Sequence, residues 1–216
     1  MITVYGFKWL PPFVQGQSRD IRVRWALEEA GLAYEEKLLS FDEQKAEAFR
    51  AIQPFGQLPA YEEDGLVMFE SGAILQHIAA KSPVLGPSDP AAWARMTCWL
   101  FAALNSIEPY LANLGNIDFF NADKEWARLY RPEALALAEQ RIDVLADRLK
   151  DRDYVEDVFT AADLLIVTML RNARGLGVLE TRPVLEAYAE RCEARPAFQR
   201  ALASHLAPFA QNAPAT

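Results

Sequence analysis

A change of pattern along the chain constrains the fold more than any other feature. Segments with strand signals are found only within the first 70 residues, and helical patterns follow them. Between the two parts, the stretch 82–90 holds three prolines and a glycine, which is typical of a linker. We therefore predict an α/β domain over 1–81, a linker over 82–90 and an all-α domain over 91–216.

The first part alternates strands and helices. Asp64-Gly65 is the strongest hairpin signal in the chain, and either Ser18 or Asp20 could cap the first helix. In chain order we expect a strand over 2–7, a helix from Ser18 or Asp20 to Gly31, a strand over 33–39, a helix over 43–52, a hairpin over 58–69 and a helix from Ser71 to about residue 80. The predicted order is β-α-β-α-β-β-α.

The second part has only helical signals. Thr160 and Asp163 match a capping box in which Asp replaces the usual Glu. The uncharged stretch 96–107 is expected to be largely buried, and the tail 211–216 is expected to fray. Helices are predicted over 91–114, 132–150, from Thr160 onward, 183–195 and 196–206.

Composition excludes several classes of function. The net charge of −8, from 22 basic and 30 acidic side chains, argues against a broad electrostatic grip on nucleic acid or anionic lipid. No apolar stretch is long enough to cross a bilayer, and the first residues lack a secretory pattern. Two cysteines, Cys98 and Cys192, make no disulfide framework, and two histidines rule out a metal site built on several histidines. We expect a cytoplasmic protein with chemically inert cysteines and no metal.

The most informative segment runs from Pro54 to Ile74. The residue before Pro59 is biased toward extended backbone, so Leu58 presents an N–H and a C=O that could pair with a peptide-like ligand. Glu70 and Ser71 lie at the start of a helix, where free N–H groups favour a carboxylate and Glu70 can accept from an ammonium group. The alternative is a purely structural role, as a surface hairpin followed by a capped helix.

Four motifs in the right order carry a resemblance. The chain resembles a bacterial glutathione S-transferase in the runs Gly56-Gln57-Leu58-Pro59-Ala60, Glu70-Ser71-Gly72-Ala73-Ile74-Leu75, 22–31 and 159–164. The resemblance covers nearly the whole chain. It implies a thioredoxin-like N-terminal domain, a helical-bundle C-terminal domain, a homodimer in the cytoplasm and a role in detoxification.

The same resemblance implies a glutathione site. The Leu58–Pro59 bond would be cis, Leu58 would pair with the cysteinyl backbone, Glu70 and Ser71 would hold the γ-glutamyl end, and Gln57 would lie beside them. Glutathione would be a co-substrate, with no further cofactor. Its thiolate, the nucleophilic form of the thiol, would attack a small electrophile that we expect to be apolar.

The residue that activates the thiol is less defined. Ser18 is our first candidate, because its spacing to Arg22 resembles that of serine-type relatives, and a purely capping Ser18 is the alternative. The loop before it is longer than is usual in the family. Tyr5 is the runner-up, although its place inside a strand favours a role in the core. Arg19 could stabilise the thiolate by its charge or lie solvated on the helix.

The second substrate should meet the sulfur in an apolar pocket. Trp9, Phe13 and Trp99 are its candidate walls, with a core position as the alternative for Trp99. Two further functions share the glutathione site: a non-catalytic binding or regulatory protein, and a glutathione-dependent peroxidase or isomerase.

Overall fold

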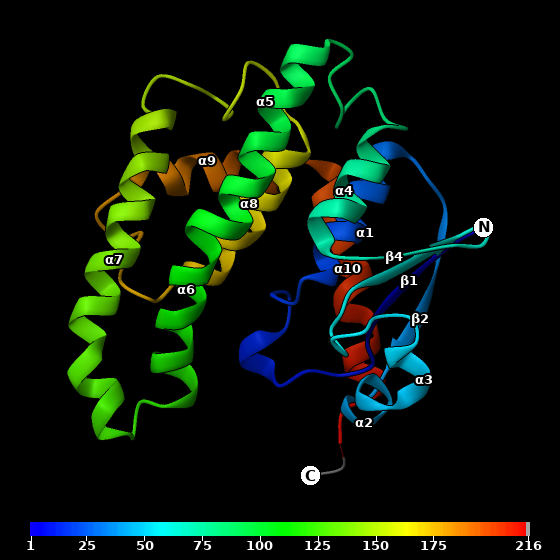
Figure 1. The fold of residues 1–216 in the computed structure, drawn as a ribbon, viewed down its shortest axis with the longest axis horizontal. Coiled ribbons are helices and arrows are strands. Elements are labelled where there is room, and N and C mark those ends of the chain that lie inside the picture. The colour runs from blue at the N-terminus through cyan, green and yellow to red at the C-terminus, as the bar shows by residue number, and fades with distance from the viewer. Residues whose placement is uncertain (215–216) are drawn as a thin grey trace. The chain divides into compact units, whose positions relative to one another are not determined.

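A computed structural model describes residues 1–214 (Figure 1). The chain forms two compact units: residues 1–87 together with the C-terminal segment from Ala194 make unit 1, and Ser88–Glu193 makes unit 2. The predicted β-α-β-α-β-β-α order followed by helices is confirmed. The predicted boundary at residues 82–90 left the last helix with the second domain, whereas by packing this helix is part of unit 1.

Unit 1 is built on a four-stranded mixed sheet with the order β2-β1-β3-β4. Strand β1 runs parallel to β2 and antiparallel to β3, and β3 and β4 form the predicted hairpin around Asp64 and Gly65, both with positive φ. The register places Ala60 opposite Phe69. The strands are β1 (Ile2–Phe7), β2 (Tyr34–Leu39), β3 (Ala60–Glu63) and β4 (Leu66–Phe69).

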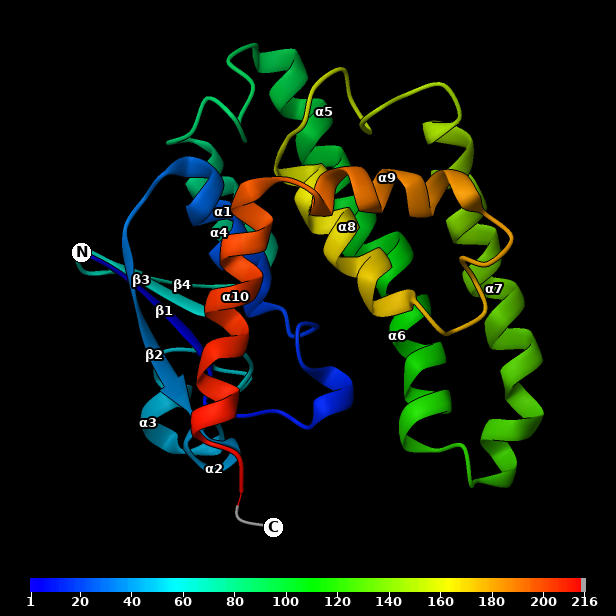
Figure 2. The ribbon, with the colours of Figure 1, turned by 180° about the vertical axis from the view of Figure 1, so that it is seen from behind.

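Helix α1 lies at the centre of unit 1, in contact with β1, α4 and α10. Figure 2 shows α10, the C-terminal helix, lying along α1. Trp25 of α1 is fully buried and meets Phe198 of α10 edge to face, with ring centroids 4.7 Å apart. The helices of unit 1 are α1 (Asp20–Ala30), α2 (Phe41–Lys45), α3 (Glu47–Arg50), α4 (Ser71–Ala79) and α10 (Pro196–Gln211).

Three predictions for unit 1 helices are wrong in detail. The single helix expected over 43–52 is two short helices, because Ala46 is extended and α2 begins earlier, at a capping box of Ser40 and Glu43. The N-cap of α1 is Arg19, whose side chain makes no capping bond, rather than Ser18 or Asp20. The last helix extends to Gln211, and of the tail expected to fray, residues 215–216 lie outside the described residues.

A glycine on β1 permits the close approach of α1. A Cβ atom at Gly6 would lie 2.8 Å from both the Asp20 carboxylate and the Arg24 guanidinium. On the sheet, an apolar cluster fixes the segment that leads into β3. It consists of Tyr5, Leu39, Phe49, Leu58 and Ala60.

Unit 2 is all helical, with α8 at its core. Eleven of the thirteen residues of α8 are buried, which explains its almost continuous apolar sequence. The elements are α5 (Pro90–Phe101), a π-helical segment (Ala102–Ile107), α6 (Glu108–Gly115), a second π-helical segment (Asn116–Phe120), α7 (Glu125–Leu149), α8 (Ala161–Ala173) and α9 (Pro183–Glu193).

Two expectations for unit 2 are corrected. The stretch 96–107 is buried on one face only, through Met96, Leu100, Ala103 and Ile107, so Cys98 is exposed. These four residues recur three or four positions apart, which is the spacing of one helix face. The helix expected from Pro132 begins at Glu125, and Pro132 lies inside it rather than in its first turn.

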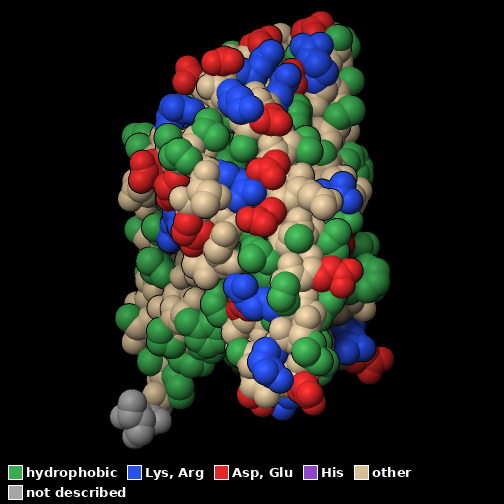
Figure 3. All heavy atoms as spheres, turned by 90° about the vertical axis from the view of Figure 1, so that its left-hand side faces the viewer, with side chains coloured by type: hydrophobic (Ala, Val, Ile, Leu, Met, Phe, Trp, Pro, Cys, Tyr) green, Lys and Arg blue, Asp and Glu red, His purple; other side chains and the backbone are tan. Residues whose placement is uncertain are grey.

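One face of the molecule carries mixed charge. Figure 3 shows a face on which Lys and Arg side chains are interspersed with Asp and Glu, so this face presents no extended field of one sign. Across residues 1–214, every helix falls short of the combined length and apolar character that a bilayer crossing demands.

The predicted capping box of α8 is confirmed and generates a test of unit 2. The buried Asp163 accepts from the backbone N–H groups of Val155 and Thr160, the Thr160 hydroxyl and the Tyr188 hydroxyl, at 2.9 to 3.1 Å. Asp163→Ala leaves these buried donors without an acceptor, so we expect a loss of about 2–4 kcal/mol in the free energy of unfolding, measured with urea. Ser40→Ala, in the exposed capping box, should cost less. Equal losses would contradict this account.

Glu63 generates a pH-dependent prediction for unit 1. Hydrogen bonds from Lys81, His77 and Tyr61 lower the pKa of Glu63 to about 2. A carboxylate whose pKa falls on folding stabilises the protein above its unfolded pKa of about 4.3 and loses this contribution as the pH falls toward 2. At pH 7 we expect Glu63→Gln to lower the free energy of unfolding by about 1 kcal/mol, since the group is partly exposed. A difference that stays constant down to pH 2 would contradict the prediction.

Candidate functional site

The β3–β4 hairpin brings the two most informative sequence segments together. Because Ala60 pairs with Phe69, Leu58 and Pro59 before β3 lie at the same end of the hairpin as Glu70 and Ser71 after β4. The Leu58–Pro59 peptide bond is cis, as the resemblance implied. The sequence segments at 54–60 and 69–74 therefore lie together at one end of the hairpin in unit 1.

Leu58 offers a polar backbone edge beside an apolar anchor. Its side chain is buried in the cluster with Tyr5 and Phe49. Among the described residues, no hydrogen bond is found for its backbone N–H or C=O. The loop before it is fixed, since the N–H of Gln57 donates to Gln53 at 3.1 Å and Gln44 donates to the carbonyl of Gly56 at 2.8 Å. A fixed strand-like edge with a free donor and acceptor can add an extended peptide.

The start of α4 offers donors to an anion. Glu70 is the N-cap and has φ 69°, a conformation that strains a residue other than glycine. The first hydrogen bond at this end runs from Ile74 to the carbonyl of Glu70, and within residues 1–214 the N–H groups of Ser71, Gly72 and Ala73 have no acceptor. Together with the helix dipole, these N–H groups favour a carboxylate.

Ser71 adds a hydroxyl that is already oriented. It is 4% exposed and its oxygen accepts from the buried Arg22 guanidinium of α1 at 3.2 Å. Since its oxygen accepts that bond, its O–H remains to donate to a ligand. This contact also joins the first turn of α1 to the start of α4. Glu70 itself is exposed and carries the negative charge of the site.

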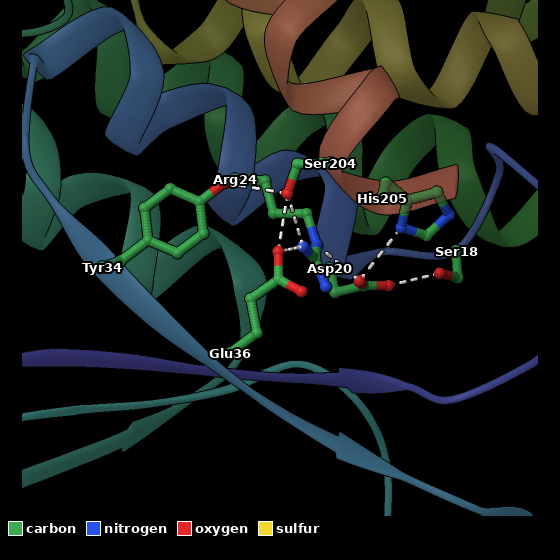
Figure 4. A network of polar contacts seen from close by, with 7 residues as sticks. All are labelled: Ser18, Asp20, Arg24, Tyr34, Glu36, Ser204 and His205. Atoms are coloured by element: carbon green, nitrogen blue, oxygen red, sulfur yellow. Dashed lines mark hydrogen bonds and ion pairs between the residues drawn. The ribbon is translucent and has the colours of Figure 1, made fainter. Parts of the chain in front are cut away.

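Ser18, the first candidate for thiol activation, is half-buried at the entry to α1 and donates its hydroxyl proton to Asp20. Asp20 is fully buried and also accepts from Arg24 at 3.0 Å and from His205 of α10 at 3.1 Å (Figure 4). Burial alone would raise the pKa of Asp20, but His205, Arg24 and Ser18 hold it well below its usual range. Asp20 is therefore a permanent carboxylate that the hydroxyl of Ser18 faces.

Tyr5, the runner-up, lies in the core. Its ring is 1% exposed and packs against Phe49, and its hydroxyl donates to Glu62 at 2.6 Å. Burial and the Glu62 carboxylate raise the pKa of Tyr5 well above its usual range. Its proton is thus held by the protein itself.

The remaining candidates have different surroundings. Arg19 is exposed at the N-terminus of α1. Trp9 is half-buried and Phe13 is 54% exposed in the short helical turn Pro12–Val14 of the β1–α1 loop. Trp99 belongs to unit 2, where its indole N–H donates to Glu156 at 3.0 Å and Arg148 lies over its ring. The pocket formed by these aromatics stays a prediction.

Sequence reasoning missed the residues behind Ser18. Asp20 was considered only as a cap, and His205 only in the count of histidines. No local spacing joins residues 185 positions apart, so no sequence signal could have paired them. Among the described residues, no three His, Cys, Asp or Glu side chains gather as a metal site requires.

Known proteins are similar to this chain in sequence and in fold. A family model described as "Glutathione S-transferase, N-terminal domain" matches residues 14–80. A glutathione S-transferase of Hyoscyamus muticus is 33% identical over 172 residues, covering 73% of this chain and 79% of the relative. A maleylacetoacetate isomerase of Rhizobium meliloti is 31% identical over 85% of this chain and 91% of its own.

A solved structure has a similar fold. The glutathione transferase of Burkholderia graminis, with two glutathione molecules bound per subunit, has a TM-score of 0.83 and 28% identity over 94% of this chain and 88% of its own. The sequence identity extends over most of the length of the relatives, and the fold is shared along nearly the whole chain. This protein belongs to the glutathione S-transferase family.

Proposed function

We propose that this protein binds glutathione in unit 1, lowers the pKa of its thiol and transfers the thiolate to a small electrophile. The observation that carries the proposal is the pairing, at one end of the β3–β4 hairpin, of a free backbone edge at Leu58 with three free N–H groups at the start of α4. Bound glutathione in the Burkholderia graminis relative supports the choice of ligand.

The chemistry of glutathione matches the two features. The cysteinyl N–H and C=O would pair with the C=O and N–H of Leu58, as an added strand does. The γ-glutamyl carboxylate would accept from the Ser71 hydroxyl and the N–H groups at the start of α4, and its ammonium would face Glu70. Gln57, exposed beside Leu58, would contact the γ-glutamyl end.

The reaction needs an ionised sulfur held in position. A thiol with a pKa near 8.5 is mostly protonated at neutral pH, so a donor to the sulfur raises the fraction of thiolate. Ser18 would supply this donor by turning its proton from Asp20 to the sulfur, and Arg19 would add a positive charge. The thiolate then attacks an electrophilic carbon, and as the S–C bond forms a leaving group such as chloride departs with the electron pair of its own bond. The protein supplies position and electrostatic stabilisation. In unit 1, Trp9 and Phe13 of the β1–α1 loop are the proposed apolar walls for the electrophile.

A second candidate function uses the same thiolate. The Rhizobium meliloti relative named as an isomerase matches most of this chain. In such a reaction the thiolate would add to a cis double bond and leave again after rotation, so glutathione would not be consumed. Assays with a chlorinated nitroaromatic acceptor and with a cis-enedione distinguish the two functions. We also propose that the protein is a homodimer and that it is located in the cytoplasm.

Titration calorimetry tests the binding site. Ser71→Ala should weaken glutathione binding about tenfold, because one hydrogen bond to a carboxylate is lost. A glutathione analogue without the γ-glutamyl carboxylate should bind the wild type and the variant with the same affinity. An equal loss for both ligands would show that Ser71 acts on the fold rather than on this carboxylate, and no loss for either would place the carboxylate elsewhere.

Ultraviolet absorbance of the thiolate tests the activating residue. In Ser18→Ala, we expect the thiol pKa of bound glutathione to rise by about one unit and conjugation at neutral pH to fall about tenfold, with little change in affinity. Tyr5→Phe is the matched control, as it also removes one hydroxyl and should leave the thiol pKa unchanged. The reverse outcome would assign the role to Tyr5. Glutathione bound with an unshifted thiol in the wild type would favour a non-catalytic binding protein.

A further inference from the structure

The Asp20 carboxylate accepts hydrogen bonds from residues near both ends of the chain. Asp20, in the first turn of α1, accepts from Ser18, from Arg24 one turn later and from His205 on α10 (Figure 4). Both Asp20 and Arg24 are fully buried, and Arg24 is also paired with Glu36. Three donors thus compete for one carboxylate that water does not reach.

His205 is directed at this carboxylate alone. It is 1% exposed and its ring meets Phe209 edge to face at 5.0 Å. A carboxylate only accepts, so Nδ1 of His205 carries the proton of the 3.1 Å contact with Asp20. Its Nε2 atom is buried and finds no hydrogen-bond partner within the described part of the chain. Its one polar contact among these residues is therefore Asp20.

The geometry is not that of a hydrolytic triad. In a triad, the imidazole accepts the proton of the serine and the carboxylate orients the imidazole. Here, Ser18 donates directly to the carboxylate, and in residues 1–214 no hydrogen bond joins Ser18 to His205. Since both Ser18 and His205 are hydrogen-bonded to Asp20 and not to each other among the described residues, His205 acts on Ser18 only through Asp20.

The number of donors on Asp20 decides how tightly it holds the Ser18 proton. A buried carboxylate that loses one donor concentrates its charge on the donors that remain. Without His205, the Ser18–Asp20 bond would strengthen and the Ser18 proton would turn less readily to another acceptor. With His205 in place, part of that charge is satisfied from α10.

We propose that His205, acting through Asp20, is a positioning residue that controls how readily the Ser18 hydroxyl turns to the sulfur of bound glutathione. This inference rests on the proposed function, in which Ser18 donates to the thiolate. It gives α10, the C-terminal helix of unit 1, a role in the chemistry at the entry to α1.

The test measures the thiol pKa of bound glutathione by ultraviolet absorbance in the full-length protein. His205→Leu should raise this pKa by about half a unit or more, with little change in the affinity for glutathione. His205→Asn should restore the wild-type value, because its amide keeps a donor at the position of Nδ1 and only removes the unpartnered Nε2. Asp20→Asn should lower the thiol pKa, since a neutral amide holds the Ser18 proton less strongly and no longer places a negative charge near the sulfur.

The control is Glu29→Gln, which weakens the α1–α10 contact at another point. Glu29 binds Arg195, the N-cap of α10, at 2.5 Å and the Trp25 indole at 3.0 Å, and no hydrogen bond joins it to Asp20 among the described residues. A comparable loss of stability in Glu29→Gln with an unchanged thiol pKa supports the inference. An equal rise in Glu29→Gln would overturn it, because His205 would then act only through helix packing.

The double variant Ser18→Ala/His205→Leu separates this inference from the proposed function. If His205 acts through Ser18, its removal has no further effect once Ser18 is gone. A rise that persists in the Ser18→Ala background, or a His205→Leu protein with the wild-type thiol pKa, overturns the inference and leaves the function intact. A wild type that does not lower the thiol pKa overturns both. Should His205→Leu fail to fold, opposite shifts in Asp20→Asn and Ser18→Ala support the inference, and equal shifts overturn it.

Discussion

The buried Asp20 carboxylate is the interaction on which the arrangement of unit 1 depends. An unpaired carboxylate in this position would be very costly, so its three donors must stay in place. Ser18 lies at the entry to α1, Arg24 lies on the next turn of α1, and His205 connects the C-terminal helix to the carboxylate. Gly6 on β1 is the counterpart in the sheet, because any side chain there would push this cluster away.

The cluster continues toward β2 as a chain of polar contacts. Arg24 donates to Ser204 at 3.0 Å, Ser204 donates to Glu36 at 2.6 Å, and Tyr34 lies 3.3 Å from the Ser204 hydroxyl (Figure 4). Strand β2, helix α1 and helix α10 are thereby joined by hydrogen bonds that run from the buried Arg24 through the half-buried Ser204 to the exposed Glu36. The site at the start of α4 is linked to the same helix through Arg22 and Ser71. Helix α1 thus supports both Ser18 and Ser71 of the proposed glutathione site.

Local sequence signals predicted the elements that carry their own chemistry. The Asp64-Gly65 turn, the Thr160–Asp163 capping box and the β-α-β-α-β-β-α order follow from turn residues, caps and apolar spacing. The division into α2 and α3 had a signal that was not used, since Ser40 and Glu43 form a capping box before the predicted start. The stretch 96–107 was overestimated in burial because uncharged composition does not reveal that only one helix face is covered.

Long-range contacts were beyond sequence reasoning for a physical reason. His205 meets Asp20, and Arg195 meets Glu29, across more than 160 residues, and such pairs leave no periodicity in one sequence. The association of the last helix with unit 1 therefore had no local signal. For the proposed site, the residue types indicated donors and acceptors, but the hairpin register was needed to bring Leu58 and Ser71 together.

A crystal structure of the complex with glutathione tests the central claim most directly. The account predicts that the cysteinyl backbone forms two hydrogen bonds with Leu58, and that the γ-glutamyl carboxylate lies within about 3.2 Å of the Ser71 hydroxyl and of an N–H group at the start of α4. Glutathione bound away from the Leu58 edge, or with its γ-glutamyl end turned from Ser71, would contradict it.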